Sequence, residues 1–490
     1  MEVHLERVTA TPLGSDELRV RHRAGPRRRG GLPVLPRALT IAVFVSVLAA
    51  CGGTTKPSVE PEVTQDDAGE MDIEMMVADA DPEVDSEAET SESDAHDGEV
   101  VAAADAVIEP PADTAVPVDA GEDVADVVGP ESRDDIYGVS VLRAESWWVD
   151  AGLIYHKDAV RRLRGINWFG LETSDRALHG TWFGRKVESF LAELHTLGFD
   201  ALRIPVSPES INPGFGAASW AQNAYEAGEA ATGREQLERL IGVATDFAIL
   251  LDFHTCDPTQ LGTALPGRPD VCQGYDADRW LADLTTLATL ARDHDNVLGI
   301  DLTNEPHALT WSQWKALAER GAEAVLRANP RLLVFVEGVA GASRYGIHYP
   351  FWGENLTEAA SQTPNIPRSR LVFSPHAYGP GIANQSYFAA ANFPVNMPAI
   401  WDAHFGHLVP SFGFAVGEFG GHYDDDAQAG EVAWNEAFVS YLATRDRRGP
   451  ASFFYWCLNA NSGDTGGLYL DDWTTIDQKR LTLLAPLLAR

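Results

Sequence analysis

Two glutamates in this sequence stand where short apolar segments end. Glu305 follows the segment 299–304 and precedes Pro306, and Glu418 lies near the end of the segment 414–420. Because Pro306 cannot donate a backbone hydrogen bond and disfavours helical backbone in the residue before it, we expect Glu305 to be extended at the C-terminal end of a strand. Two carboxylates at the ends of two buried strands can face each other across a sugar. The pair therefore predicts the acid–base and nucleophilic chemistry that cleaves glycosidic bonds.

The elements that would position these acids form a repeating pattern from about residue 136. Eight apolar segments predict strands, and segments with helical spacing alternate with them, such as the one that ends at Gly198. The predicted strands are 163–170, 200–207, 247–254, 297–306, 332–339, 370–379, 414–420 and 451–459. Continuous apolar strands that alternate with helices are typical of a parallel sheet closed into a barrel, so we predict an α/β fold, a (β/α)8 TIM barrel. The helical pattern is weakest between the fifth and sixth predicted strands. Residues 140–160 predict a β-hairpin that precedes the first strand of the barrel.

Polar and aromatic residues occupy the ends of most of these predicted strands. In a barrel of this kind the chemistry lies at the C-terminal ends of the strands. One such residue alone is more often a satisfied interior polar group, but seven strands that share the pattern indicate a site. The residues concerned are Asn167, Trp168, Arg203, His254, Asn304, Glu305, His376, Tyr378, Glu418 and Trp456.

Several separated motifs in the globular region point to one family. They are GINWFG (165–170), HGTW (179–182), ALRIPVS (201–207), DLTNEPH (301–307), VEGV (336–339), NMPAIW (396–401), GEFG (417–420) and SGDTGGLYLDDW (462–473). Through them the chain from about 140 to 475 resembles glycoside hydrolase family 5 (cellulase family A), and within it the bacterial endo-β-1,4-glucanases. The last motif and HGTW make the resemblance specific to these endoglucanases within the family. The resemblance implies a retaining endo-acting hydrolase of β-1,4-glucosidic bonds.

The resemblance also implies a role for each matching residue. Glu305 would be the acid/base and Glu418 the nucleophile. Asn304 would hold the 2-hydroxyl of the attacked sugar, and Trp456 would be the platform beneath it. The residues that would orient and hydrogen-bond the nucleophile and the sugar are Arg203, His254, His376 and Tyr378.

These roles agree with the physical chemistry of the residues. Arg203, with His and Tyr donors, would keep Glu418 ionised, and the negative charge of Glu418 would raise the pKa of Glu305. Trp168 and Trp182 are further candidates for stacking on sugar rings, although either could equally be a core tryptophan. Relatives often carry a second aromatic residue shortly after the eighth-strand tryptophan, where this chain has Cys457 and Leu458.

The N-terminal third of the chain differs in composition from the rest. Residues 57–135 contain 27 Asp and Glu residues against one Arg, and they have no aromatic residue. Such a segment cannot bury enough apolar surface to fold, so we predict an acidic disordered linker at 51–135, with a specific acidic binding tail as the alternative. The net charge of −35 argues against nucleic acid as a partner. The catalytic domain is then 136–490.

Residues 1–50 have the features of a targeting segment. Arginines precede a twelve-residue apolar run that ends in Leu-Ala-Ala before Cys51, and the run is too short for a comfortable membrane-spanning helix. The ending resembles a bacterial lipobox, which predicts lipidation at Cys51; ordinary secretion and an internal hydrophobic patch are the alternatives. We therefore expect an exported protein, anchored by lipid at the outer membrane or cell surface, with no other membrane contact.

The remaining cysteines and the substrate complete the expectations. Cys256 and Cys272 bracket a Pro- and Gly-rich loop, which in an exported protein predicts a disulfide more often than a metal site, and Cys457 is interpreted as a small hydrophobic residue. The spacing of Cys and His predicts no metal centre, and we expect no cofactor.

We expect a monomer with a β-glucan substrate. Open alternatives are a mannanase, xyloglucanase or β-1,3-glucanase on the same barrel, or a non-catalytic surface glycan-binding protein.

Overall fold

The computed structural model describes residues 143–258, 274–307, 309–340, 351–424, 427–445 and 449–489. The predicted targeting segment with Cys51, the predicted linker and Cys272 lie outside these residues. Among the described helices, none combines the length and the apolar composition needed to cross a membrane.

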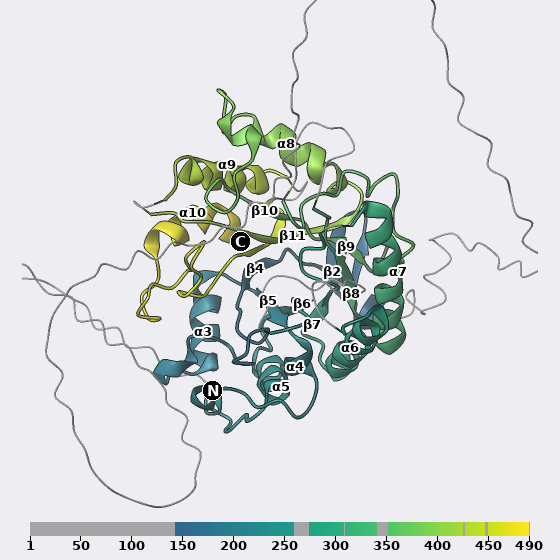
Figure 1. The fold of residues 1–490 in the computed structure, drawn as a ribbon, viewed down its shortest axis with the longest axis vertical. Helices are drawn as coiled ribbons and strands as arrows, with labels where there is room; N and C mark the ends of the chain where they lie inside the picture. Colours follow the sequence, from purple (N-terminus) through teal and green to yellow (C-terminus); the bar gives the residue numbers. More distant parts are fainter. Residues whose placement is uncertain are drawn as a thin grey trace, which may run out of the picture. The chain divides into compact units, whose positions relative to one another are not determined.

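The described residues form a closed parallel barrel (Figure 1). Its strands follow the order β10-β11-β12-β4-β5-β6-β7-β8-β9, and the ring closes because β11 pairs with both β9 and β10. The strands are β4 Arg164–Asn167, β5 Ala201–Val206, β6 Ala248–Phe253, β7 Val297–Asp301, β8 Leu333–Val336, β9 Leu371–Phe373, β10 His376–Tyr378, β11 Gly413–Gly420 and β12 Ser452–Tyr455. The predicted (β/α)8 barrel is confirmed.

Helices surround the strands in Figure 1. They are α3 Val187–Leu197, α4 Pro208–Ile211, α5 Gly233–Val243, α6 Ala277–Leu290, α7 Trp311–Ala328, α8 Met397–His404, α9 Glu431–Ala443 and α10 Gln478–Leu488. Gly198 ends α3 with a φ of 102°, a left-handed backbone that favours glycine. The weakly predicted fifth helix is absent from the described residues between β8 and β9, where 351–370 contains only turns and extended backbone.

The predicted sixth strand is divided in two. β9 ends at Phe373 and β10 begins at His376, and both pieces pair with β11. Pro375 lies in the break, where it cannot donate a hydrogen bond to a neighbouring strand. The break brings His376 and Tyr378 into a short strand of their own at the mouth of the barrel.

A three-stranded hairpin closes the opposite end of the barrel. It consists of β1 Trp147–Asp150, β2 Leu153–His156 and β3 Ala159–Val160, as predicted around residues 150–152. Trp147, Val149 and Ile154 of the hairpin pack in one buried cluster with residues from the beginnings of the strands, such as Ala201 and Ala248. The hairpin therefore covers the end of the barrel at which the strands begin.

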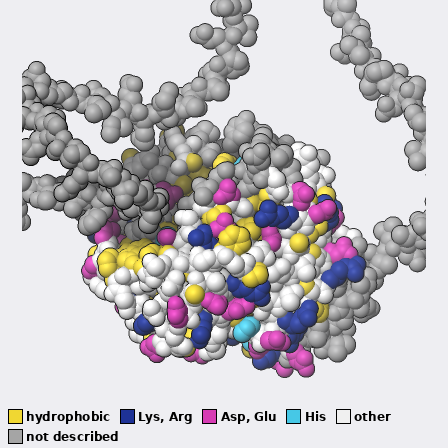
Figure 2. Space-filling view, turned by 60° about the horizontal axis from the view of Figure 1, so that its bottom comes forward, with side chains coloured by type: hydrophobic (Ala, Val, Ile, Leu, Met, Phe, Trp, Pro, Cys, Tyr) yellow, Lys and Arg dark blue, Asp and Glu magenta, His cyan; other side chains and the backbone are white. Residues whose placement is uncertain are grey.

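The outer surface of the described residues carries charges of both signs. On the face in Figure 2, Lys and Arg side chains are interspersed with Asp and Glu side chains. This face therefore offers no single-sign patch, in contrast to the acidic composition of residues 57–135.

Candidate active site

A cavity of about 690 Å³ lies at the C-terminal ends of the barrel strands. This volume is in the range of pockets that bind small organic ligands. Seven residues after or at the ends of strands line it: Phe169, His254, Asn304, Glu305, Tyr378, Glu418 and Trp456. The cavity therefore brings together most of the residues that the sequence singled out.

Glu418 is held in this cavity by donors on both carboxylate oxygens. It lies on β11 and is only 3% exposed. Arg203 donates a hydrogen bond of 2.5 Å to Oε1, and the hydroxyl of Tyr378 donates one of 2.6 Å to Oε2. Charge-assisted donors of this kind stabilise the ionised carboxylate. Glu418 is thus arranged as an anion that points into the cavity.

Glu305 adopts a backbone conformation that the sequence did not predict. Its φ is +46°, in the left-handed region, so the expectation of an extended residue is wrong. Pro306 disfavours right-handed helical backbone, and a tertiary contact then selects the rare alternative, because the Glu305 N–H donates a 2.8 Å hydrogen bond to Oε2 of Glu337. Backbone strain of this kind is typical of functional sites.

The carboxyl group of Glu305 differs in proton affinity from an ordinary glutamate. Burial raises its pKa to about 7, and the carboxylates of Glu418 and Glu337 act in the same direction. His376, whose Nδ1 lies 3.1 Å from Oε1 of Glu305, opposes the rise. Near neutral pH Glu305 therefore retains a substantial protonated fraction.

The two catalytic candidates lie close enough to act on one bond. Glu305, His376 and Glu418 each place one side-chain atom within 4.8 Å of the other two. Oxygen atoms of the two carboxyl groups therefore lie within 4.8 Å of each other.

Arg203 lies at the centre of a buried group of acids. It is the third residue of β5, so it lies deeper than a strand end, and its guanidinium reaches upward to Glu418. Its other ion-pair partners are Asp252 at 3.1 Å, Asp301 at 3.2 Å and Glu337 at 3.1 Å. It also donates hydrogen bonds of 3.1 Å to the side-chain oxygens of Asn167 and Asn304. Although burial alone would lower it, these anions raise the pKa of Arg203 well above its usual value.

His254 and Trp456 form one wall of the cavity. Their rings are nearly parallel, with centroids 5.9 Å apart, and Phe169 lies parallel to Trp456 at 5.7 Å. Nδ1 of His254 is 2.6 Å from Oδ2 of Asp252, which fixes the ring. Burial would lower the pKa of His254, but Asp252 raises it above its usual value. The flat face of Trp456 is suited to the CH surface of a sugar ring.

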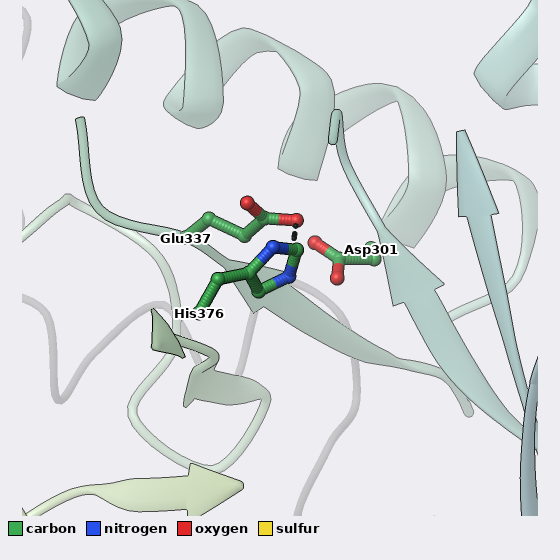
Figure 3. Close-up of side chains that lie close together, drawn as sticks. All are labelled: Asp301, Glu337 and His376. Carbon is green, nitrogen blue, oxygen red and sulfur yellow. Dashed lines mark ion pairs between the residues drawn. The ribbon is translucent and has the colours of Figure 1, made fainter. Parts of the chain in front are cut away.

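His376 contacts a third acid, Glu337 (Figure 3), as well as Glu305 and Glu418. Its Nε2 lies 3.2 Å from Oε1 of Glu337, and its Nδ1 lies 3.5 Å from Oε2 of Glu418. Burial would lower the pKa of His376, but Glu337 and Glu418 raise it well above its usual value. Gly353 allows this packing, because a Cβ there would lie 2.7 Å from Oε2 of Glu337.

The side chains in Figure 3 also raise the question of a metal. Asp301, Glu337 and His376 place one donor atom each within 4.8 Å of one another. The guanidinium of Arg203 already supplies positive charge to the two acids. We therefore assign no metal to this group.

Two of the predicted sugar-stacking tryptophans do not line the cavity. Trp168 is fully buried, donates a 2.9 Å hydrogen bond to the carbonyl of His179 and packs on Phe190, so its assignment to the substrate site is wrong. It follows β4, but its side chain points into the layer between sheet and helix. Trp182 is half-buried behind His179 and next to Trp220, and its contact with sugar stays a prediction.

The structure adds acidic residues that the sequence analysis did not assign to the site. Glu337 directly follows β8, and it had the same signal as Glu305, an acid after a buried strand. Asp252 and Asp301 lie inside strands that are otherwise apolar, which is the sequence signal that could have found them. Glu172 lines the cavity and is 3% exposed, and burial raises its pKa.

Trp352 is the other residue that the sequence did not reveal. It lines the cavity, is 46% exposed and stacks on His307 with ring centroids 4.0 Å apart. Nδ1 of His307 lies 2.9 Å from the carbonyl oxygen of Glu305, so the Trp352 ring stands beside the acid/base candidate. Trp352 belongs to no predicted element, so strand-end reasoning could not identify it.

Two of the cysteines discussed above, Cys256 and Cys457, lie among the described residues, and they differ in their bonding state. Cys256 is disulfide-bonded, and Cys272, its predicted partner, lies outside the described residues. Cys457 is a buried free thiol, and burial raises its pKa to about 12.

Comparisons with known proteins identify relatives of this chain. The family model "Cellulase (glycosyl hydrolase family 5)" matches residues 158–462. The major extracellular endoglucanase of Xanthomonas campestris pv. campestris is 39% identical over 343 residues, which are 67% of this chain and 68% of that protein. An endoglucanase of Paenibacillus polymyxa is 34% identical over 345 residues, which are 65% of this chain and 81% of that protein.

Solved structures agree with these matches. The catalytic domain of the Xanthomonas campestris endoglucanase superposes with a TM-score of 0.64 at 36% identity, covering 70% of this chain and 99% of that domain. A hyperthermophilic endocellulase from Pyrococcus horikoshii gives a TM-score of 0.64 at 31% identity, covering 70% and 98%.

Proposed function

The chain belongs to glycosyl hydrolase family 5, the cellulase family, and from this membership we propose that this glycoside hydrolase is a retaining endo-β-1,4-glucanase of cellulose-type polysaccharides. The observation that carries the proposal is the pairing of Glu305 and Glu418. One acid has a pKa raised to about 7, and the other accepts hydrogen bonds from Arg203 and Tyr378, with the two within 4.8 Å. Retaining glycosidases need this short separation, whereas inverting enzymes leave room for a water between the acids.

In the first step, Glu418 attacks the anomeric carbon while Glu305 protonates the departing glycosidic oxygen. The bond from the anomeric carbon to that oxygen breaks, and a bond to the Glu418 carboxylate forms. Glu305 has lost its proton and is now a base. In the second step it takes a proton from water, whose oxygen displaces Glu418 and restores both residues.

The residues around the pair support the role of Glu418 as the nucleophile and of Glu305 as the acid/base. Arg203 and Tyr378 bind the ionised nucleophile, and His376 lies between both acids. The side-chain oxygen of Asn304 accepts a hydrogen bond from Arg203, which leaves its NH2 group to donate to a sugar hydroxyl.

The aromatic faces of the cavity support a polymer of flat sugars. Trp456 and Trp352 both line the cavity, and β-1,4-linked glucose presents flat CH surfaces on its rings. A solved structure of the Pyrococcus horikoshii endocellulase, 30% identical to this chain, is described as a complex with cellotetraose. A β-mannan, xyloglucan or β-1,3-glucan substrate is the alternative within the same fold.

Export and anchoring are also part of the proposal. The Xanthomonas campestris relative is named as an extracellular enzyme, which supports export of this chain. The lipobox-like sequence before Cys51 supports a lipid anchor, and residues 51–135 would then be a tether to the catalytic domain. A disulfide between Cys256 and Cys272 fits an oxidising location. One chain supplies every site residue named above, so a monomer is sufficient.

Initial rates on a panel of polysaccharides test the substrate. We expect the highest rate on a soluble cellulose derivative, compared with mannan, xyloglucan, lichenan and β-1,3-glucan. A higher rate on mannan, xyloglucan or β-1,3-glucan would replace the β-1,4-glucanase proposal by that activity. Binding without hydrolysis of any of them would make the chain a glycan-binding protein.

A further inference from the structure

Four carboxyl groups surround the guanidinium of Arg203 beneath the cavity. Asp252, Asp301 and Glu337 are 0% exposed, and Glu418 is 3% exposed. Each pairs with Arg203 at 2.5 to 3.2 Å. The fixed charge of one guanidinium cannot balance four anions.

Two histidines add further positive charge to this group. His254 pairs with Asp252 at 2.6 Å, and His376 lies 3.2 Å from Glu337 and 3.5 Å from Glu418. With both histidines protonated and all four carboxyls ionised, one negative charge is still unbalanced. A buried group with an unbalanced charge takes up a proton in preference to staying ionised. The group therefore holds one more proton, in addition to the proton of Glu305.

Hydrogen bonds and ion pairs together show which carboxyl has room for this proton. Asp252 pairs with both Arg203 and His254, whereas Asp301 forms its one ion pair among the described residues with Arg203. Glu418 accepts from Arg203 and Tyr378, and Glu337 accepts from Arg203 and the N–H of Glu305. Asp301 accepts one bond only among the described residues, from Nε of Arg203 to its Oδ2. Its buried Oδ1 has no hydrogen-bond partner there.

The carboxyl that neighbours Asp301 on the next strand is that of Asp252. Asp252 on β6 is the register partner of Asp301 on β7. Oδ1 of Asp252 is also buried without a hydrogen-bond partner in the described part of the chain, although it lies 3.1 Å from Nη2 of Arg203. Unmatched buried oxygens are costly, and a proton on Asp301 turns one of these two acceptors into a donor.

We propose that Asp301 is protonated while the enzyme works, and that it is a positioning residue for Arg203. Through Oδ2 it orients the guanidinium, and because it is neutral it does not compete with Glu418 for the positive charge. The groups that face it are Arg203 on β5, Asp252 on β6, Glu337 after β8 and His376 on β10. The effect of burial and of Glu337, which raise the pKa of Asp301 well above its usual value, agrees with this assignment. Figure 3 shows the Asp301 carboxyl turned toward His376 and Glu337.

Isosteric amides test the charge of each acid, and this part of the test rests on the proposed hydrolase function. Asn has the shape of a protonated Asp and can donate from the same position. D301N should lose clearly less kcat/KM on an aryl cellobioside than the charge-removing controls below, and its pH profile should move by less than about half a pH unit. The controls D252N and E337Q remove real negative charges from the same group, and each should lose about a hundredfold or more. A loss in D301N as large as in the controls, with the variant still folded, overturns the proposal.

Infrared spectroscopy tests the proton without any activity. At about pH 9, where Glu305 is ionised, the wild-type protein should still show the C=O stretch of a buried carboxylic acid. The band should shift when aspartate carboxyls carry ¹³C, which requires no variant, and it should be absent in D301N but present in the control E172Q. A spectrum with no aspartate-sensitive acid band overturns the proposal, whether or not the enzyme hydrolyses cellulose.

Discussion

Nδ1 of His376 lies 3.1 Å from Oε1 of Glu305, so a buried imidazole contacts the acid/base candidate directly. His376 stabilises the ionised form of Glu305, and burial opposes it more strongly. The balance sets the pKa of Glu305 at about 7. We therefore expect the pH range of activity to depend on this contact.

The first prediction concerns pH. Because Glu305 must be protonated to donate, kcat/KM should fall as pH rises through about 7, the pKa of Glu305. Removing the imidazole in H376N removes an interaction that lowers this pKa, so the falling limb should move to higher pH. The measurement is kcat/KM of both proteins on one cello-oligosaccharide over pH 4 to 10, at about ten pH values. A limb that moves to lower pH would contradict the assigned effect of His376.

The second prediction separates the roles of the two acids. A cello-oligosaccharide is a poor leaving group that needs a proton, so E305A should lose several orders of magnitude on polymer. An aryl cellobioside with an acidic phenol leaves unaided, so E305A should still form the glycosyl-enzyme, which then accumulates. Added azide should speed its turnover and give the β-azide. E418A lacks the nucleophile and should be inactive on both substrates.

The anomeric configuration of the products is the control for this assignment. Azide rescue of E418A should proceed by direct displacement and give the α-azide. An α-azide from E305A and a β-azide from E418A would exchange the two roles. Equal losses on both substrates in both variants would indicate a structural defect, which thermal unfolding would detect.

The third prediction concerns Trp352. Its exposed ring stacks on His307 beside Glu305 and lines the cavity. Loss of this aromatic face in W352A should raise KM for cellohexaose about tenfold, as expected for a stacking contact worth ~1.4 kcal/mol. The KM for a short aryl cellobioside should change less. F183A is a matched control, because Phe183 is 67% exposed and does not line the cavity; an equal effect in both variants would refute a sugar platform at Trp352.

The fourth prediction concerns the disulfide. If Cys256 pairs with Cys272, a thiol reagent under denaturing and non-reducing conditions should label Cys457 as the single reactive thiol of the domain. A bond that closes a loop of this size stabilises the fold by about 3 kcal/mol in the chain-entropy model. Intact-mass analysis before and after reduction gives the count. Labelling of Cys272 without reduction would exclude the pairing.

The fifth prediction concerns the anchor. Cys51→Ala removes the residue that would carry the lipid, so the enzyme should move from the membrane fraction to the soluble fraction. G53A, which keeps the cysteine, is the control and should stay with the membrane. An unchanged distribution of Cys51→Ala would count against lipidation and leave ordinary secretion.

Much of the barrel and both catalytic candidates could be predicted from the sequence because they depend on local patterns. A strand that is buried on both faces is a continuous apolar run, and this pattern marked every barrel strand. Glu305 was visible because it follows such a run, and Glu418 because it lies near the end of one. The same reasoning failed for Trp168, since a position after a strand does not fix the direction of a side chain, and Trp168 turns into the core.

What only the tertiary structure decided concerns contacts between distant strands. The left-handed backbone of Glu305 depends on an acceptor from Glu337, 32 residues away. The grouping of Asp252 and Asp301 around Arg203 depends on the register of three neighbouring strands. This register pairs Asp252 with Asp301 and places Arg203 two residues before the level of Asp252. Local sequence patterns carry no information about register between strands, because it is set when the whole barrel closes and packs. For this reason the sequence identified the two acids, and the fold determined the charges that distinguish them.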